Sequence, residues 1–219
     1  MTLAPPVVRT PVTWESPGVT AARDLLTFVS SAVRSPAVIG AVAPSGRALC
    51  DLLASVAPQD GSATVVELGP GTGVVSQALR RRLAPEARHV AVEIDPGMVT
   101  HLTRTRPWLE VVHGDAKDLQ KLLADIGITR VDTVVSGLPW TLFSREAQRG
   151  IMEQVSRVLV PGGVFTTFAY RHVMNLPTQR RFRELLEQSF DEVRVTPTVW
   201  RNVPPALAYQ CRNLGADGT

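Results

Sequence analysis

Three glycines, Gly69, Gly71 and Gly73, follow a short apolar run at residues 64–68 and can act chemically through their backbone. Glycine lets the chain turn tightly and bring its N–H groups against a ligand, because no Cβ stands in the way. At a strand-to-helix turn those N–H groups meet the ligand. The dinucleotide fingerprint requires its third glycine at position 74, where Val74 stands, and no Gly-Lys-Ser/Thr of a P-loop follows. The pattern therefore argues against nicotinamide, flavin and P-loop enzymes.

Carboxylates follow the next two apolar runs. Glu93 stands twenty residues after Gly73, and a carboxylate there can accept both hydroxyls of a ribose. Asp95 is better placed to cap the helix that begins at Pro96. The third run ends in His113-Gly114-Asp115-Ala116, where Asp115 or a backbone amide can meet an adenine edge. Three such features at the ends of three successive strands predict one site for a nucleoside-bearing ligand.

The elements that must position these residues alternate between strand and helix. Apolar runs predict strands at 64–68, 89–93, 109–113, 131–135 and 164–170, and two closing strands at 192–200 and 206–211. Amphipathic patterns predict helices between them and two more before the first strand, one over 20–34 and one after Ser45. Short connections between alternating strands and helices predict an α/β fold, a doubly wound, mostly parallel sheet covered by helices on both faces.

Length and composition predict one domain. The chain has 219 residues, of which 44% are hydrophobic and 20% charged, as in ordinary globular proteins. We expect a flexible arm at 1–19, a domain at 20–212 with a helical cap (20–58) and a sheet core (62–212), and a tail at 213–219. The sequence lacks a signal peptide, a stretch for a membrane span and cysteine or histidine spacing for a metal. We therefore expect a cytoplasmic protein with no metal.

The combination of ELGPGTG, AVEID and GDA resembles the cofactor site of class I S-adenosyl-L-methionine-dependent methyltransferases, in the style of ribosomal RNA adenine dimethylases, over about residues 40–212. The resemblance implies a seven-stranded, Rossmann-like sheet with an antiparallel last strand. It also implies that Glu93 and Ile94 bind the ribose and that Asp115 and Ala116 bind the adenine. The methionine part would be held by the following residues: Glu67, Gly69, Pro70, Gly71, Thr72, Gly73, Ser136 and Gly137.

The residues after the fourth strand concern the methyl acceptor. Adenine dimethylases carry Asn-Leu-Pro followed by Tyr or Phe there, and the asparagine amide accepts a hydrogen bond from the base. This chain has Gly137-Leu138-Pro139-Trp140. Trp140 keeps a ring that can stack, but the amide is missing, which argues against a nucleobase as acceptor.

Three further blocks resemble bacterial phospholipid N-methyltransferases, which methylate phosphatidylethanolamine towards phosphatidylcholine. They lie at 28–49, 136–139 and 199–206, and Trp140 departs from the pattern, where a smaller aliphatic residue is expected. The resemblance implies a phospholipid acceptor at an anionic membrane surface, on which the protein would be peripheral at the inner face. The net charge of +3 is compatible with phosphate-bearing surfaces.

The acceptor-side residues have assigned roles under this hypothesis. A primary ammonium must lose its proton before transfer, and Tyr170, His172 or Asp115 can take it. The rings of Trp140 and Tyr170 can form a cation–π surface for the methylated ammonium. Trp200 and Arg201 can meet a phosphate. In the helix over 20–34, Leu25 and Phe28 either contact the membrane or help to cap the cofactor cleft.

Three alternatives remain open from the sequence. A small-molecule methyltransferase of specialised metabolism is favoured by Trp140. A nucleic-acid (adenine-N6) methyltransferase is weakened by Gly137 and by the lack of a basic appended domain. A protein that binds the cofactor without transferring a methyl group fits the same intact glycines and carboxylates. The sequence leaves the oligomeric state open.

Overall fold

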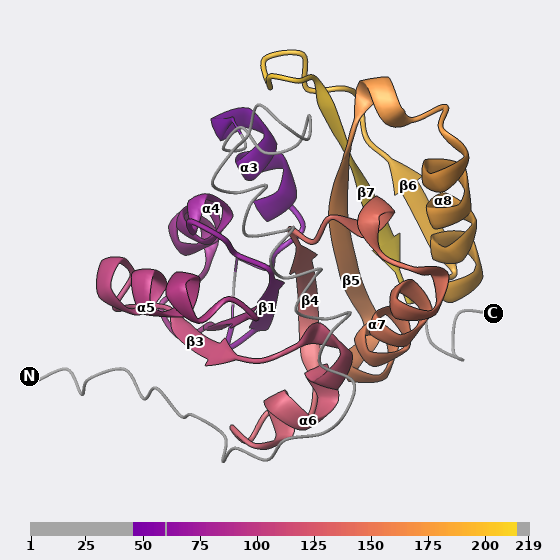
Figure 1. Cartoon of the computed structure of the whole chain (residues 1–219). Helices are drawn as coiled ribbons and strands as arrows, with labels where there is room; N and C mark the ends of the chain where they lie inside the picture. The colour runs from indigo at the N-terminus through magenta and orange to yellow at the C-terminus, as the bar shows by residue number, and fades with distance from the viewer. Residues whose placement is uncertain (1–45, 60, 214–219) are drawn as a thin grey trace, which may run out of the picture.

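A seven-stranded sheet runs through the part of the chain that the computed structural model describes, residues 46–59 and 61–213 (Figure 1). Its spatial order is β3-β2-β1-β4-β5-β7-β6. The strands are β1 (Thr64–Leu68), β2 (Arg88–Glu93), β3 (Glu110–His113), β4 (Val131–Ser136), β5 (Leu159–Tyr170), β6 (Glu192–Val195) and β7 (Ala206–Arg212). β7 is antiparallel to both of its neighbours, and the other pairs are parallel. The doubly wound sheet predicted from the sequence is thus confirmed.

Helices cover both faces of this sheet. They are α3 (Arg47–Ala54), α4 (Val74–Arg82), α5 (Pro96–Thr105), α6 (Leu119–Ala124), α7 (Arg145–Val158) and α8 (Pro177–Ser189), with 3₁₀ turns η1 (Ala116–Asp118), η2 (Trp140–Leu142) and η3 (Arg171–Val173). Successive strand residues point to opposite faces. Accordingly, Val65 packs with α3 and α4, whereas its neighbour Val66 packs with α6 and α7. A small third cluster joins α5 to β2 and β3.

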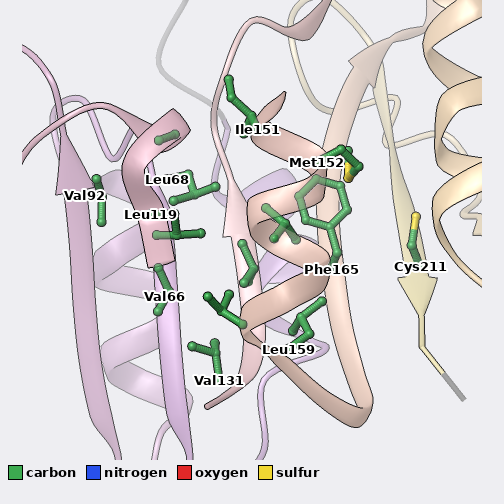
Figure 2. Packing of buried hydrophobic residues seen from close by; sticks show 14 of the residues in the cluster. Val66, Leu68, Val92, Leu119, Val131, Ile151, Met152, Leu159, Phe165 and Cys211 are labelled. Atoms are coloured by element: carbon green, nitrogen blue, oxygen red, sulfur yellow. The ribbon is translucent and has the colours of Figure 1, made fainter. Parts of the chain in front are cut away.

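The larger core lies on the α6–α8 face. Figure 2 shows Val66, Leu68 and Val92 from the sheet meeting Leu119, Ile151 and Met152 from the helices. Aromatic rings fill the part of this core nearest α8. The ring of Trp140 stacks on Phe182 at 5.0 Å between centroids and meets the edge of Phe165 at 5.9 Å. The end of β4 is therefore anchored to the packed interior through the turn that follows it.

The strand order reverses between β1 and β4. The chain builds β1, β2 and β3 outward on one side and then returns to place β4 on the other side of β1. In doubly wound sheets, the helices that follow two such strands turn to opposite faces, and ligands bind at this switch point. Leu68 lies beside Ser136 in the register, so the loops that follow β1 and β4 are neighbours. The glycine-rich loop after β1 therefore lies at this switch point.

Some predicted boundaries differ from the structure. The strand expected over 192–200 ends at Val195, and Trp200 lies in the loop before β7 with 72% of its surface exposed. Pro197 supplies no backbone N–H for strand pairing, and only an isolated bridge, Val199 to Ala206, follows it. β5 begins earlier than expected, at Leu159. The predicted arm and most of the cap, with Leu25 and Phe28, lie outside the described residues.

Candidate cofactor and acceptor site

The glycine-rich loop after β1 has a backbone that other residues rarely adopt. Gly69, Gly71 and Gly73 have φ angles of 65°, 56° and 77°, in the left-handed region. A Cβ placed on Gly71 would meet no atom within 4 Å, so this side of the loop is open. Gly73 is the N-cap residue of α4. The loop thus leads into the start of a helix and leaves its backbone open at Gly71, the arrangement that suits an anionic or polar ligand.

Glu93 ends β2 with a carboxylate that faces this loop. Its Oε1 accepts hydrogen bonds from the N–H groups of Ile94 at 2.9 Å and Asp95 at 3.0 Å, and its Oε2 accepts one from Gly71 at 3.2 Å. The side chain is buried, and this desolvation raises the pKa of Glu93 above its ordinary value of 4.5, although the three N–H groups oppose the shift. The carboxylate is consequently held in one orientation beside the loop.

The side chain of Glu67 is buried and makes its polar contacts inside the protein. Its Oε2 accepts a hydrogen bond of 2.6 Å from the hydroxyl of Ser76, in the first turn of α4, and lies 3.3 Å from Nε2 of His89. Only 2% of Glu67 is exposed. In the described residues, Glu67 therefore acts on the glycine-rich loop through α4, by fixing the helix that the loop begins.

The end of β3 is joined to the end of β2. The N–H of Gly114 donates to the carbonyl of Glu93 at 3.0 Å, and Nε2 of His113 lies 3.1 Å from the carbonyl oxygen of Ile94. Asp115 caps the turn η1 by accepting a hydrogen bond of 3.0 Å from the N–H of Lys117, and its side chain remains partly exposed. The sequence analysis did not predict this contact of His113. Its position at the end of the third strand, two residues before Asp115, could have indicated a role at the site.

The loops after β1 and β4 touch at Gly137. The N–H of Gly137 donates to the carbonyl of Leu68 at 2.8 Å, and a Cβ added to Gly137 would stand 2.6 Å from the carbonyl oxygen of Gly69. Only glycine fits this approach, because a backbone atom blocks the position of any side chain. The same contact explains why the asparagine of adenine dimethylases has no counterpart here. Ser136 is buried, and its hydroxyl accepts a hydrogen bond of 3.1 Å from Nε1 of Trp140.

The expected acceptor-side role of Trp140 does not match its surroundings. The sequence predicted that its ring would stack on the acceptor, but only 3% of the residue is exposed, and its ring packs on Phe182. Gln148 also donates to its carbonyl oxygen at 2.6 Å. Trp140 is therefore part of the core in this structure, because η2 turns the indole inward towards α8.

The other acceptor-side residues lie at the ends of β5 and β6. Tyr170 ends β5, and its ring stacks on His172 with centroids 5.8 Å apart. His172, Trp200 and Arg201 are exposed. The N–H of Arg171 donates to the carbonyl of Pro205 at 2.8 Å, which joins the end of β5 to the loop that carries Trp200. Tyr170 and His172 are thus brought together, and that loop is joined to the same strand end.

Asn202 was missed by the sequence reasoning. It is buried in the exposed loop before β7, where its Oδ1 accepts a hydrogen bond of 2.7 Å from Gly46 and its Nδ2 donates to Pro204 at 2.6 Å. The loop is therefore fixed to the start of α3. An asparagine just before two prolines could have indicated this role, because its side-chain amide can form the hydrogen bonds that backbone groups make in regular structure.

The described residues fit the cofactor that the sequence resemblance implies. An ionised carboxylate offers about four lone-pair sites, and Glu93 uses three of them for backbone N–H groups. One site remains for a ribose hydroxyl. The open side of Gly71 leaves room for the ligand, and Asp115 on the neighbouring strand end keeps a partly exposed carboxylate for an amino group.

Comparisons with known proteins agree with this arrangement. Residues 65–163 match the family described as methyltransferase domain. The chain is 34% identical over 195 residues to an ornithine lipid N-methyltransferase of Singulisphaera acidiphila, with 88% of this chain and 97% of the relative covered. The comparisons give no support to the expected kinship with ribosomal RNA adenine dimethylases.

Solved structures share the fold at low sequence identity. A TehB-like SAM-dependent methyltransferase from Corynebacterium glutamicum has a TM-score of 0.56 at 15% identity, over 88% of this chain and 98% of that chain. Human methyltransferase-like protein 13 in complex with SAH has a TM-score of 0.58 at 18% identity, over 77% and 81%. Aeropyrum pernix fibrillarin with natively bound S-adenosyl-L-methionine has a TM-score of 0.56 at 16% identity, over 75% and 74%.

Proposed function

Because the chain belongs to the class I S-adenosyl-L-methionine-dependent methyltransferases, we propose that it methylates the amine of a membrane lipid headgroup. One observation carries the lipid acceptor. A lipid N-methyltransferase is 34% identical over 195 residues, which cover 88% of this chain and 97% of that relative. The shared fold alone would not choose an acceptor, since one fold hosts many substrates.

The cofactor supplies a methyl group on a positively charged sulfur. In the proposed complex, the remaining site of Glu93 accepts a hydrogen bond from one ribose hydroxyl, and Asp115 accepts one from the adenine amino group. The glycine-rich loop and the backbone at Ser136 and Gly137 would hold the methionine part. Transfer to nitrogen forms a carbon–nitrogen bond while the carbon–sulfur bond breaks, so the protein contributes chiefly by positioning the acceptor.

The acceptor nitrogen needs a free electron pair, and an ammonium must therefore lose a proton first. Tyr170 and His172 are the proposed bases because they stand together at the end of β5, and β5 pairs with β4, the strand that Gly137 follows. Arg201 and Trp200, on the loop joined to that strand end, are the proposed contacts for the anionic group of the headgroup, which is a phosphate in phosphatidylethanolamine.

A pH profile tests the proposed bases. Replacing His172 with Gln, or Tyr170 with Phe, should lower kcat/KM by about 10²–10⁴-fold near neutral pH if that group takes the proton. The loss should shrink at alkaline pH, where the amine deprotonates without help. A loss that stays constant with pH would indicate a positioning role, and an unchanged kcat/KM would remove that residue as the base.

The acceptor is proposed to be an amino lipid with a primary amine. Phosphatidylethanolamine is the acceptor expected from the sequence, and ornithine lipid gives the relative its name. Both headgroups end in a primary amine. Within the described residues no helix has the length and apolarity to span a membrane, and we propose that the protein works from the membrane surface.

Labelled S-adenosyl-L-methionine distinguishes the acceptors. The purified protein is mixed with vesicles that contain phosphatidylethanolamine, ornithine lipid or neither, and the lipids are then extracted. Label in one amino lipid and not in the vesicles without it identifies the acceptor, and its mono-, di- or trimethylated form gives the number of transfers. Cofactor binding with no label in either lipid would overturn the lipid proposal in favour of a small-molecule acceptor or of a protein that binds the cofactor without transfer.

A nucleobase acceptor is the weakest alternative. Position 137 cannot hold an asparagine while Gly69 stays where it is, because a Cβ there would already lie 2.6 Å from a backbone oxygen. A small-molecule acceptor was favoured by Trp140, but the burial of that ring in the core removes the argument. Neither alternative therefore has an observation of its own in the described residues.

A further inference from the structure

The exposed large apolar side chains of the described residues gather in the connections after β4, β5 and β6, which we call the acceptor half. They are Leu142, Leu176, Trp200 and Val203, with 38%, 48%, 72% and 78% of their surface exposed. Single exposed apolar residues are ordinary on protein surfaces and need no explanation. Their common location is unusual, because each lies in a connection that follows β4, β5 or β6.

These three connections share one edge of the sheet. β4 and β5 are parallel, and β6 runs the same way because both β5 and β6 are antiparallel to β7. Their carboxyl ends therefore point to the edge that also carries the glycine-rich loop. Figure 1 shows the β6–β7 connection and the turn before α8 at this end of the sheet. The turn η2 contacts α8, so the connection after β4 adjoins the same region.

The charge of the same connections is one-sided. Residues 137–144, 171–176 and 196–205 contain Arg171, His172 and Arg201 but no aspartate or glutamate, in a chain that has 20 acidic residues. Across the same edge, the cofactor half, which consists of the loops after β1, β2 and β3, carries Glu93 at the end of β2 and Asp115 after β3. Apolar and amphipathic side chains beside arginines are the composition that anionic lipid surfaces attract.

The loop that carries Trp200 and Val203 is fixed at its base. Asn202 bonds to Gly46 and Pro204 inside it, and Val199 pairs with Ala206 where it meets β7. The two large side chains nevertheless point outward, with more than two thirds of each exposed. A loop held this way presents its apolar tip without the ordering cost of a flexible segment.

We propose that this edge of the sheet docks on an anionic membrane, with Trp200 and Val203 entering the headgroup layer and Arg171 and Arg201 meeting lipid phosphates. Tryptophan suits the interface because its ring is apolar and its N–H is polar. The inference rests on the proposed function, since docking here would bring the membrane against the edge where the acceptor amine must meet the cofactor.

Vesicle sedimentation tests the docking surface. Vesicles of phosphatidylcholine and phosphatidylglycerol, without an amino lipid, are incubated with the protein at low salt. Val203→Asp should weaken binding at least about tenfold, because burial of a valine is lost and a carboxylate faces the anionic surface. Thr129→Asp is the matched control. Thr129 is also exposed, in the loop before β4 at the opposite edge, so the same added charge should leave binding nearly unchanged.

Tryptophan fluorescence supplies a second readout. The emission should shift to the blue when anionic vesicles are added to the wild-type protein, because the indole of Trp200 leaves water, and the shift should be lost in Trp200→Ser. Unchanged affinity for S-adenosyl-L-methionine in both variants shows that they fold. Equal vesicle binding by wild type, Val203→Asp and Trp200→Ser would overturn the proposal, and so would equal losses in Val203→Asp and Thr129→Asp.

Activity in detergent micelles separates this inference from the proposed function. Val203→Asp should methylate an amino lipid dispersed in micelles as the wild type does, and should fail only on vesicles. Lipid methylation with no dependence on Val203 in either setting would refute the docking surface and keep the function. Binding to vesicles through Val203 without methylation of any lipid would keep the docking surface and refute the function.

Discussion

The two halves of the carboxyl edge are built differently. In the cofactor half, backbone groups of the loops after β1, β2 and β3 bond to one another and to Glu93, as in the pairs Gly71–Glu93 and Gly114–Glu93. In the acceptor half, the connections after β4, β5 and β6 expose Leu176, Trp200 and Val203. The polar groups of the cofactor half are therefore hydrogen-bonded to one another, whereas the acceptor half exposes apolar side chains to solvent.

This difference separates what the fold requires from what the acceptor requires. The cofactor half is fixed by the left-handed conformations of its glycines and by hydrogen bonds to the buried carboxylate of Glu93. These features depend on the fold and not on the identity of the methyl acceptor. Structures only 15 to 18% identical share the fold. Loops on a rigid scaffold carry specificity, and we therefore expect changes in the acceptor half to alter the substrate while the cofactor site stays intact.

Replacing Trp140 should have the largest effect on stability. It tests whether this residue belongs to the core or to the acceptor half. Trp140→Ala should lower the free energy of unfolding by about 3–5 kcal/mol, because a stacked indole leaves a cavity. Trp140→Phe keeps the ring against Phe182 but loses the bond to Ser136, which should cost about 0.5–1.5 kcal/mol. Denaturant unfolding measures both changes.

Kinetics distinguish this core role from contact with the acceptor. At a temperature where Trp140→Phe stays folded, KM for the acceptor should equal that of the wild type. A raised KM with unchanged stability would instead place the indole in the acceptor site and would remove the contrast that its burial creates.

Glu93→Gln should disable the cofactor half while leaving the acceptor half intact. We expect affinity for S-adenosyl-L-methionine to fall by about 1.5–3 kcal/mol, since hydrogen bonds to a charged group are lost. Isothermal titration measures this change. Vesicle binding should be unchanged, because the docking surface lies in the other half. Normal cofactor affinity in the variant would show that the ribose is held elsewhere.

The pH dependence of stability gives a second test of Glu93. Burial raises its pKa in the folded protein above 4.5, so the stability that protonated Glu93 contributes is present below 4.5 and is lost as pH rises through the folded pKa. Glutamine does not titrate. The unfolding free energy of Glu93→Gln relative to wild type should therefore move in favour of the variant as pH rises from 4 towards neutrality, and the opposite slope would contradict the raised pKa.

The sequence predicted the cofactor half better than the acceptor half for a physical reason. Glu93 and the three glycines depend on strand ends and local backbone conformation, which the pattern of apolar residues reveals. The cap at Asp95 was likewise predicted, and its Oδ1 accepts a hydrogen bond of 2.8 Å from Met98. Local signals sufficed because each of these contacts joins an element to the turn that begins or ends it.

The acceptor half depends on contacts between distant segments. The direction of the Trp140 ring follows from packing against Phe182, and no periodic pattern extends from one to the other. The loop around Asn202 is shaped by a bond to Gly46, 156 residues away in the sequence. The strand predicted up to Trp200 ended early for a local reason: alternation continues past Val195, but Pro197 supplies no N–H for pairing, and the ladder ends where Val195 meets Tyr209.

Gly137→Ala tests whether the two halves must touch. Its Cβ would stand 2.6 Å from the carbonyl oxygen of Gly69, so the loops must separate. We expect a loss of about 1–3 kcal/mol in stability or cofactor affinity. Gly150→Ala is the matched control. Gly150 lies in α7 with nothing within 4 Å of an added Cβ, so alanine should stabilise the helix by about 0.5–1 kcal/mol. Equal effects of the two substitutions would mean that the contact between loops is dispensable.

The attraction between the Tyr170 ring and the methylated ammonium should give the smallest effect, and its test sharpens the description of the acceptor half itself. If its ring attracts the methylated ammonium, Tyr170→Phe should keep the attraction and Tyr170→Leu should lose about 0.5–2 kcal/mol. The KM for an already dimethylated amino lipid should then rise in Tyr170→Leu more than the KM for the unmethylated lipid, because methyl groups on the charged nitrogen weaken its hydration and favour contact with the face of an aromatic ring. An equal loss in Tyr170→Phe and Tyr170→Leu, the same for all three acceptors in the methylation series, would assign the hydroxyl rather than the ring. In that case Tyr170 would act on the acceptor through its hydroxyl and not through the attraction of its ring to the methylated ammonium.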